Sequence, residues 1–155
     1  MENEINEQFM KEALAEARLA AAEGEVPVGC VIVKDGAIIA RAHNSAKGDK
    51  NALSHAELKA LSAAIKSEAW RLPGCDMYVT LEPCSMCAGA IVHARIERLY
   101  IAARDPKGGA CGSVLDVTGN PALNHHPEIH FGLLGEESSA LLRGFFKELR
   151  NSKKA

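Results

Sequence analysis

A strand, a helix and a second strand follow one another in the middle of the chain, and this pattern constrains the fold more than any other. DMYVTL (76–81) and RLYIAA (98–103) are apolar runs with β-branched and aromatic residues, which favour strands. Between them, Pro83 suits the first turn of a helix that runs to about Ala94. Two strands joined in this way lie parallel, with a right-handed crossover. The sequence therefore predicts an α/β fold.

The first part of the chain predicts a helix followed by a hairpin. From Glu7 onward, apolar residues recur at three- and four-residue steps, as on the buried face of a helix. GCVIVK (29–34) and AIIARAH (37–43) are short apolar runs separated by Asp35-Gly36. This pair suits the positive φ angles of a type I′ turn, so we expect the two runs to pair as antiparallel strands.

Three further elements complete the prediction. A second helix is expected from Ser54, a candidate N-cap, to about Ile65. A strand is expected near 128–134, and a last helix at about 136–151. The connection 104–128 is long and rich in Gly and Pro, and such loops in compact domains are commonly functional, so we interpret it as the wall of a site.

Together these elements predict one domain, residues 1–155, with loose ends at about 1–6 and 152–155. We expect a mixed sheet covered by helices on both faces, in a three-layer α/β/α arrangement. No repeat or low-complexity tract interrupts the chain.

Composition limits the cellular setting and the class of partner. The start, MENEINEQ, is acidic and polar, unlike a secretory signal, and no apolar run is long enough to span a bilayer. We therefore expect a cytoplasmic protein whose five cysteines stay reduced. The net charge of −2 gives no global sign of nucleic-acid binding, although basic residues accumulate toward the C-terminus, where they could form one basic face or a solvated surface.

One histidine and two cysteines have the spacing of a metal site. Cys84 and Cys87 lie three apart at a predicted helix start, so both sulfurs can reach one ion, although a redox pair would have the same spacing. His55, in the first turn of the preceding helix, supplies a third ligand. Three protein ligands and a free fourth position are typical of catalytic zinc. A fourth thiolate from Cys30, Cys75 or Cys111 would instead close the site as a structural one.

Glu57 favours the catalytic interpretation. It lies two residues after His55 in the same helical turn, so its carboxylate points away from the ligand yet stays close enough to reach a water on the metal. Zinc makes such a water more acidic, and a nearby carboxylate can take up its proton.

The pair HAE (55–57) and PCSMC (83–87) resembles the signature of the zinc-dependent nucleoside and nucleobase deaminases. This resemblance implies hydrolytic deamination, in which a water activated by zinc attacks the ring carbon that bears the amino group. It implies that Glu57 carries a proton from that water to a ring nitrogen and then to the departing ammonia.

A second set of motifs covers nearly the whole chain, from about Glu7 to Arg150. The segments EVPVGCVIV, RAHNSA, HAELKAL, YVTLEPCSMCAGAIVHARI, ARDPKGGACGS and GFFKELR resemble the bacterial tRNA-specific adenosine deaminases of the cytidine and deoxycytidylate deaminase superfamily. The resemblance implies a hydrolase with a cytidine-deaminase-like fold, one Zn²⁺ per chain and a homodimer. It implies that the enzyme acts on an amidine-type C–N bond and forms inosine at the wobble position in the anticodon stem-loop of an arginine tRNA.

The same resemblance implies the residues that bind the RNA. Val28 would line the pocket of the flipped adenosine, Asn44 would hydrogen-bond the nucleoside, and the backbone near Ala56 and Leu81 would contact the base. Residues placed against the anticodon loop and its flanking nucleotides are Arg104, Asp105, Lys107, Phe145 and Phe146. Structural alternatives stay open: Asn44 could end a strand, Asp105 could cap a turn or pair with a neighbouring basic residue, and the two phenylalanines could belong to the core.

Two rival functions remain at this point. A deaminase of a free base such as guanine or cytosine would share the metal motif. A non-catalytic zinc module that binds RNA would have a fourth ligand in place of the water. The loop ARDPKGGACGS (103–113) favours the tRNA enzyme over a deaminase of free bases.

Overall fold

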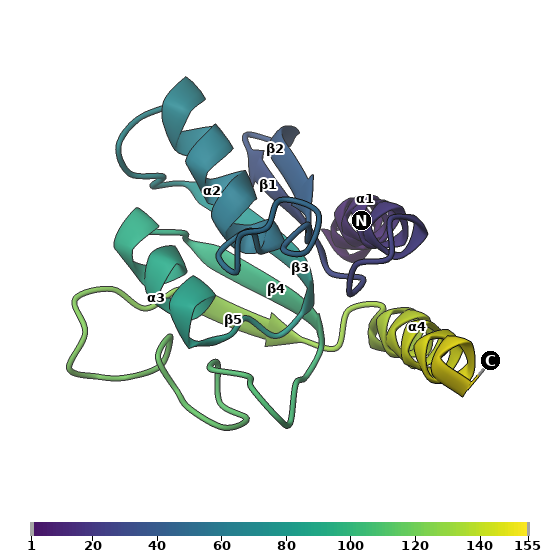
Figure 1. Cartoon of the computed structure of the whole chain (residues 1–155). Helices are drawn as coiled ribbons and strands as arrows, with labels where there is room; N and C mark the ends of the chain where they lie inside the picture. The colour runs from purple at the N-terminus through teal and green to yellow at the C-terminus, as the bar shows by residue number, and fades with distance from the viewer. Residues whose placement is uncertain (1, 155) are drawn as a thin grey trace.

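The computed structural model describes residues 2–154 and has one five-stranded sheet with helices on both faces (Figure 1). The strands lie in the order β2-β1-β3-β4-β5. The elements in chain order are α1 (Glu2–Ala22), β1 (Gly29–Lys34), β2 (Ala37–His43), α2 (Ala56–Ser67), β3 (Cys75–Leu81), α3 (Ser85–Ala94), β4 (Arg98–Ala103), β5 (Glu128–Phe131) and α4 (Gly135–Lys154).

Strand direction decides which loops meet. β1 is antiparallel to both of its neighbours, β2 and β3, whereas β3, β4 and β5 are mutually parallel. β2 therefore points the same way as β3, β4 and β5. The ends of these four strands and the start of β1 share one edge of the sheet, which we call the pocket edge. The predicted hairpin and the predicted parallel pair are both confirmed, and Asp35 and Gly36 in the hairpin turn have φ angles of 51° and 78°.

Two apolar clusters hold the layers together. One lies between the sheet and helices α2 and α3, and the other lies between the opposite face and α1. The first includes Ile32, Met77 and Leu99, and the second includes Met10 and Val31. The start of α4 packs on the same side as α1 (Figure 1). The predicted mixed sheet in a three-layer α/β/α arrangement is therefore confirmed.

The chain ends differ from the prediction. Helix α1 begins at Glu2, five residues before the predicted start, and includes residues 2–6 that were expected to be loose. Glu2 and Glu4 in the first turn suit the positive end of the helix dipole, and Asn6 accepts a hydrogen bond from the hydroxyl of Tyr78 in the sheet. Helix α4 likewise continues through residues 152–154. Met1 and Ala155 lie outside the described residues.

Two other element boundaries also shifted. The predicted strand at 128–134 ends at Phe131, because Gly132 has a φ of 98° and Leu134 a φ of 55°, which turn the chain into α4. Helix α3 begins at Ser85, not at Pro83, and Cys84 is its N-cap. None of the helices among residues 2–154 combines the length and the apolar character that a membrane crossing requires.

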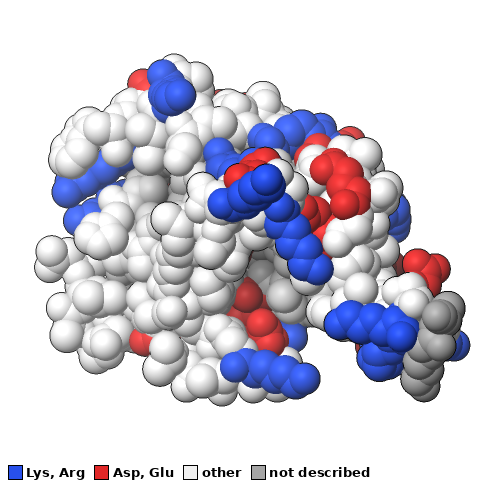
Figure 2. Space-filling model, in the orientation of Figure 1, with Lys and Arg blue, Asp and Glu red and all other residues white. Residues whose placement is uncertain are grey.

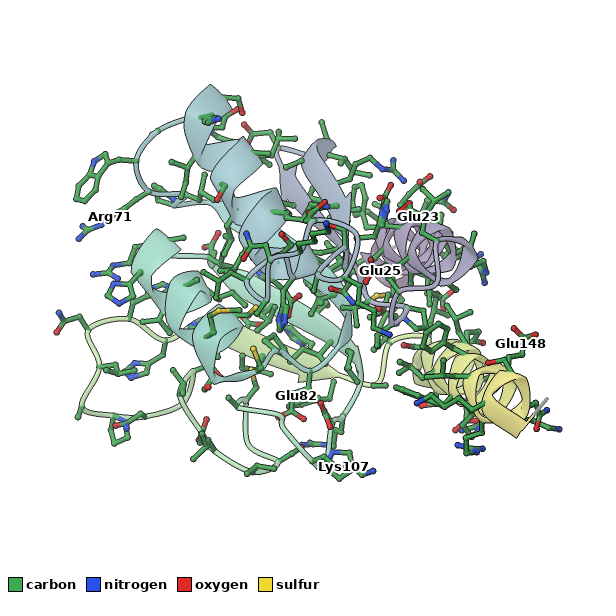
Figure 3. The ribbon with its side chains drawn as sticks, in the orientation of Figure 1. Glu23, Glu25, Arg71, Glu82, Lys107 and Glu148 are labelled. Carbon is green, nitrogen blue, oxygen red and sulfur yellow. The ribbon has the colours of Figure 1, made fainter. Side chains whose placement is uncertain are left out.

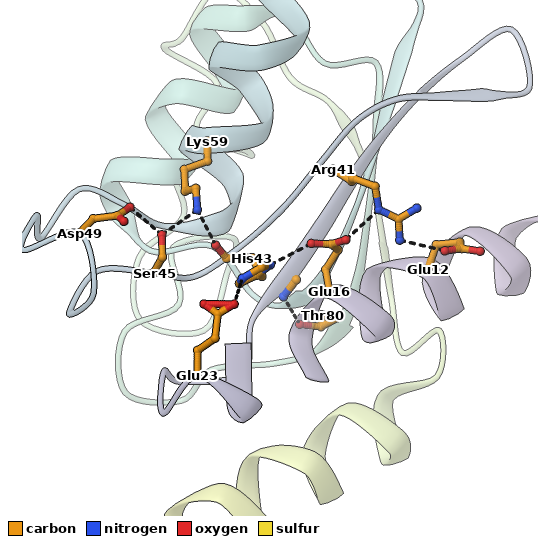
Figure 4. Close-up of polar contacts among 10 residues, drawn as sticks. Glu12, Glu16, Glu23, Arg41, His43, Ser45, Asp49, Lys59 and Thr80 are labelled. Carbon is orange, nitrogen blue, oxygen red and sulfur yellow. Dashed lines mark hydrogen bonds and ion pairs between the residues drawn. The ribbon is translucent and has the colours of Figure 1, made fainter. Parts of the chain in front are cut away.

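A polar network ties α1 to β2 beside the pocket edge (Figure 4). The buried carboxylate of Glu16 accepts hydrogen bonds from Arg41 Nε at 2.7 Å and pairs with His43 Nδ1 at 2.9 Å. The other ring nitrogen of His43 lies 2.8 Å from Glu23 Oε1. Burial alone would raise the pKa of Glu16, but the hydrogen bonds from His43 and Arg41 outweigh it and the pKa is lowered. The network thus fixes the end of β2 directly before Asn44.

Helix α1 crosses the start of β1 so closely that only glycine fits at residue 29. A Cβ atom on Gly29 would lie 2.0 Å from the carbonyl oxygen of Ala13 and 2.5 Å from the amide nitrogen of Ala17. Gly29 also donates its backbone N–H to Thr80 Oγ1 at 3.0 Å. Because both clashing atoms belong to the backbone of α1, the helix would have to move away from the sheet to admit a side chain.

Replacing Gly29 with Ala should therefore lower the free energy of unfolding by about 1–3 kcal/mol, the usual cost of overpacking a core. The matched control is Gly144→Ala in the exposed part of α4, where a Cβ meets nothing within 4 Å. That change should raise stability by about 0.5–1 kcal/mol through helix propensity. Urea unfolding followed by circular dichroism at one protein concentration measures both, and equal effects at the two sites would contradict the close approach.

Candidate active site

Three side chains meet at the pocket edge with the chemistry of a metal site. His55 Nδ1 lies 3.6 Å from Cys84 Sγ and 3.5 Å from Cys87 Sγ, and the three ligand atoms lie within 4.8 Å of one another. One imidazole nitrogen and two thiols form a donor set that suits zinc. The residues present therefore fit a Zn²⁺ ion, as the sequence predicted.

The starts of two helices create this convergence. His55 is the N-cap of α2 and Cys84 is the N-cap of α3; both have extended backbone angles, and neither side chain caps its own helix. Cys87 follows in the first turn of α3, facing the same way as Cys84. We predicted Ser54 as the N-cap of α2, which is wrong by one residue, because Ser54 pairs through its backbone with Ser45 and Asn51.

The two thiols share one proton. A hydrogen bond from the Cys87 thiol lowers the pKa of Cys84 to about 5, helped by the backbone N–H groups at the start of α3. The pKa of Cys87 is raised, because the thiol donates to Cys84 and is buried. The pair therefore carries one thiolate, and binding of a metal would release the second proton.

The remaining cysteines lie outside this group. Cys30, Cys75 and Cys111 are buried, and none belongs to the cluster of metal-ligating atoms found among residues 2–154. Burial raises the pKa of Cys111 to about 12, so it is a protonated thiol. This arrangement therefore favours a catalytic site with three protein ligands over a closed structural site with four. The fourth coordination position of a bound zinc would be available to water or substrate.

Glu57 is buried in the first turn of α2 and lines the same cavity as His55 and Cys84. Burial raises its pKa to about 7, only partly offset by its own backbone N–H and by His55. A bound dication would favour the carboxylate form of Glu57. A carboxyl group in this position can accept a proton and return it near neutral pH.

A cavity of about 220 Å³ opens beside the metal ligands. Five of the residues that the resemblance implied for substrate binding line it, namely Val28, Asn44, Ala56, Leu81 and Asp105. Sequence reasoning missed two other lining residues, Val26 and Glu82. The sequence contained an indication for Glu82, because it directly follows the apolar strand YVTL. A carboxylate buried at the end of such a strand needs hydrogen-bond donors around it.

Asn44 is held in place at the wall of this cavity. Its backbone N–H donates to Val28 O at 3.0 Å, and its side-chain Nδ2 donates to Val26 O at 3.2 Å. Its Oδ1 accepts a hydrogen bond from the N–H of Ala46 at 3.3 Å. Asn44 thus does follow a strand, as the structural alternative proposed, and at the same time its amide group lies in the pocket.

A second, wider groove of about 760 Å³ continues from the cavity toward α4. The two share Val26, Leu81 and Asp105. The groove is also lined by basic and apolar residues, namely Arg104, Lys107, Arg143, Arg150, Leu142, Phe146 and Pro106. Lys and Arg side chains gather on α4 at the lower right of Figure 2.

The two phenylalanines of α4 differ in position. Phe146 lines the groove and is 40% exposed, whereas Phe145 is half-buried and lines neither the cavity nor the groove. Their rings lie edge to face, with centroids 5.4 Å apart. Arg104 stacks its guanidinium group 3.7 Å from the ring centroid of Phe131 at the end of β5. Phe146 and Arg104 therefore line the groove, whereas Phe145 contacts Phe146 and does not line the groove.

Asp105 stands where the cavity and the groove meet. Its Oδ1 accepts hydrogen bonds from the backbone N–H groups of Lys107 at 3.0 Å and Gly108 at 3.2 Å. Asp105 therefore caps a turn, which is one of the structural alternatives. Within residues 2–154, no ion pair joins it to Arg104 or Lys107.

Comparison with known proteins agrees with this geometry. The profile of the cytidine and deoxycytidylate deaminase zinc-binding region matches residues 3–103. The tRNA-specific adenosine deaminase of Bacillus subtilis is 46% identical over 151 residues, which cover 97% of this chain and 94% of that protein. The corresponding protein of Aquifex aeolicus is 47% identical over 147 residues, covering 94% and 97%.

Two solved structures resemble the fold as well. One, from work on A-to-I editing by tRNA:A34 deaminases at the wobble position of transfer RNA, has a TM-score of 0.84 and 46% identity. The match covers 87% of this chain and 99% of the chain in that structure. The other, a guanine deaminase from Nitrosomonas europaea, has a TM-score of 0.74 and 27% identity. That match covers 90% of this chain and 83% of the chain in the guanine deaminase structure.

Replacing Cys87 with Ala should abolish stoichiometric zinc binding, because it removes one of three ligands. Metal analysis after dialysis against zinc and then buffer measures this. The matched control is Cys111→Ala, which removes a buried thiol outside the group and should keep about one zinc per chain. Full zinc content in Cys87→Ala would show that the ligand set is wrong, and loss of zinc from Cys111→Ala would favour a closed site.

Proposed function

The chain belongs to the cytidine and deoxycytidylate deaminase family, and from this membership we propose that it deaminates adenosine in tRNA. The proposed substrate is the wobble adenosine in the anticodon stem-loop of an arginine tRNA. Water replaces the amino group by hydrolysis of an amidine-type C–N bond, and the products are inosine and ammonia. The observation that carries the proposal is the position of Glu57, buried beside His55, Cys84 and Cys87 at the floor of a pocket that opens into a basic groove.

In this mechanism His55, Cys84 and Cys87 hold one Zn²⁺, and Glu57 moves the protons. Zinc, when bound, supplies a Lewis acid that lowers the pKa of a water molecule. The Glu57 carboxylate takes a proton from the attacking water and delivers it to a ring nitrogen of adenine. It then takes the remaining proton from the hydroxyl group added to the ring carbon and carries it to the amino group, which leaves as ammonia when the C–N bond breaks. Burial of Glu57 keeps bulk water away from both transfers.

The pocket walls orient the base. Val28 provides an apolar surface, and the amide of Asn44 can hydrogen-bond the nucleoside because its backbone and side chain are both anchored. Backbone groups near Ala56 and Leu81, two residues that line the cavity, contact the edge of the base. Extrusion of one nucleotide into such a pocket costs a few kcal/mol and least in a single-stranded loop, which favours an anticodon loop over a duplex.

The groove toward α4 supports a polymeric substrate. A free base would need only the small cavity, whereas Arg104, Lys107, Arg143 and Arg150 surround space beyond it. Their positive charges can neutralise phosphates on either side of the flipped nucleotide, and exposed Phe146 offers a ring for stacking an unpaired base. We infer that these residues bind the anticodon loop, with Asp105 at the junction accepting a hydrogen bond from a ribose hydroxyl.

A guanine deaminase is the strongest rival, because one of the similar structures has that activity and a related fold. A guanine deaminase has the same metal motif, so a measurement of zinc content cannot distinguish the two functions. The basic groove and the higher identity to the tRNA-specific enzymes favour tRNA. A non-catalytic zinc module that binds RNA is disfavoured by the cluster of three ligands with a buried carboxylate beside it.

We also infer that the chain works as one deaminase domain, because both apolar clusters are built on the same sheet. A cytoplasmic setting fits, since the two ligand thiols must stay reduced to hold zinc. The family resemblance adds a homodimer, supported by the exposed apolar side chains of Leu53, Val114 and Leu115.

The homodimer predicts a mass in solution of twice the 16.5 kDa chain, measurable by light scattering after size exclusion. Changing Val114 and Leu115, which are 53% and 54% exposed, together to Lys should shift the mass to that of one chain. The control is Leu19→Lys on the outer face of α1, which is 51% exposed and should leave the mass unchanged. A wild-type protein with the mass of one chain would exclude the dimer.

Incubation with total tRNA should produce inosine at the wobble position, detected by sequencing of the modified RNA. Ammonia release from free guanine, cytosine and adenine under the same conditions should be negligible.

Glu57→Gln should retain zinc and RNA binding but lose activity by about 10²–10⁴-fold in kcat, since one group makes both proton transfers. Near-normal single-turnover rates in Glu57→Gln would remove its role, and turnover of guanine without inosine in tRNA would establish the rival.

A further inference from the structure

Glu82 is a buried carboxylate whose position the proposed chemistry does not use directly. It lies between the end of β3 and Pro83-Cys84, and the residue is only 3% exposed. Its backbone N–H donates to Ala103 O at 2.8 Å, which extends the pairing of β3 and β4 toward the pocket edge. A carboxylate at this depth is costly unless donors satisfy it.

Four donors from the loop that follows β4 satisfy Glu82. Oε1 accepts hydrogen bonds from the backbone N–H of Asp105, at 3.1 Å, and from the hydroxyl of Ser113. Oε2 accepts from the backbone N–H groups of Cys111 at 3.0 Å and Ser113 at 3.1 Å. An ionised carboxylate only accepts hydrogen bonds and has about four acceptor sites, so the four donors of the loop satisfy both oxygens of Glu82.

The loop is shaped to fit around this carboxylate. A Cβ atom on Gly109 would lie 2.3 Å from Glu82 Cδ and 2.5 Å from Oε2, so only glycine fits there. The next residue, Ala110, donates its N–H to Pro83 O at 2.8 Å. Residues 105–113 contain no helix or strand of their own, and the segment 82–83 is thus their main polar attachment to the sheet.

Glu82 therefore links two parts of the site. Cys84, a proposed zinc ligand, is two residues away along the chain. The loop that Glu82 holds carries Asp105, at the junction of the cavity and the groove, and Lys107, at the groove. In Figure 3, Glu82 lies to the lower right of α3, and Lys107 lies farther out, on the loop that follows β4. The segment 82–83 thus connects the metal ligand Cys84 to the wall that would contact RNA.

We propose that Glu82 is a positioning residue that sets the RNA-contacting loop 104–113 at a fixed distance from the metal centre. The inference rests on the proposed function, because the loop matters only if the substrate extends beyond the cavity. Glu82 lines the cavity, but both of its carboxylate oxygens are engaged by the loop, and the proton transfers are assigned to Glu57. Glu82 acts through Asp105 and Lys107, so a displacement of these groups weakens contacts with the RNA that are made before and during the reaction alike, and the effect appears mainly in KM.

The test is Glu82→Gln in the full-length, zinc-loaded protein. The amide is nearly isosteric, but its NH₂ group cannot accept a hydrogen bond, so at least one backbone N–H group of the loop loses its acceptor. We expect zinc content to stay at one per chain and KM for an anticodon stem-loop RNA to rise about tenfold or more, with a smaller change in the single-turnover rate at saturating RNA. A merely destabilised protein would instead lose active enzyme, which lowers kcat and leaves KM unchanged.

Two further variants keep the test decisive. Ser113→Ala removes one of the four donors on the exposed side of the loop and should raise KM in the same direction by about threefold, even if Glu82→Gln folds poorly. Asp116→Asn is the matched control, since Asp116 caps a turn of the same long loop at Gly119 N, 2.9 Å away, but lines neither cavity nor groove. Its KM should equal that of the wild type.

Amide hydrogen exchange separates this proposal from the proposed function. In the RNA-free protein, Glu82→Gln should speed exchange at Asp105, Cys111 and Ser113, whatever the substrate is. A KM within twofold of the wild type in both Glu82→Gln and Ser113→Ala, or loss of zinc together with activity in either, would overturn the positioning role. A wild-type protein that forms no inosine would remove the RNA role as well, and the exchange rates would still report whether Glu82 holds the loop.

Discussion

The direction of one strand determines where the chemistry of this protein lies. β1 alone runs against the other four strands, so the ends of β2, β3 and β4 and the start of β1 meet at the pocket edge. Asn44 follows β2, Cys84 follows β3, Asp105 follows β4 and Val28 precedes β1, and all four line one cavity. Ligand sites at the carboxyl ends of strands are general in open α/β sheets, because each chain segment leaves the sheet there.

Helix starts provide the second constraint at this edge. The positive ends of the dipoles of α2 and α3 point toward the cavity, which favours thiolate and carboxylate groups. The N-cap positions of both helices are occupied by His55 and Cys84, whose side chains leave the helix N–H groups uncapped and turn toward each other. The cost of two missing caps is offset when a metal joins these side chains.

Buried carboxylates hold the loops on both sides of the cavity. Glu25 accepts backbone hydrogen bonds from Lys47 at 3.1 Å and Gly48 at 2.7 Å, and Glu82 does the same for the opposite loop. Each loop lacks regular structure along most of its length, so an acceptor with two oxygens replaces the missing sheet partner. The walls of the pocket can thereby be rigid although they are made of loops, and rigid walls are what orientation of a flexible RNA requires.

The sequence by itself determined what depends on short-range pattern. Two short apolar runs around Asp35-Gly36 predicted the hairpin, the strand–helix–strand pattern predicted the parallel pair, and the spacing of Cys84 and Cys87 predicted that both sulfurs face one point. Each of these follows from the periodicity of a helix or strand, which a few residues suffice to set. Family motifs then added which residues line the pocket.

Only the tertiary structure decided what depends on contacts between distant segments. The four bonds of Glu82 join residues 23 to 31 positions apart, and no local pattern encodes such a pairing. The groove exists because α4 packs beside the loop after β4, so Phe146 reaches it and Phe145 does not. The N-cap of α2 moved from Ser54 to His55 for the same reason, since Ser54 is held by the preceding loop. Local propensity sets which elements form, and long-range packing sets which side chains of those elements meet.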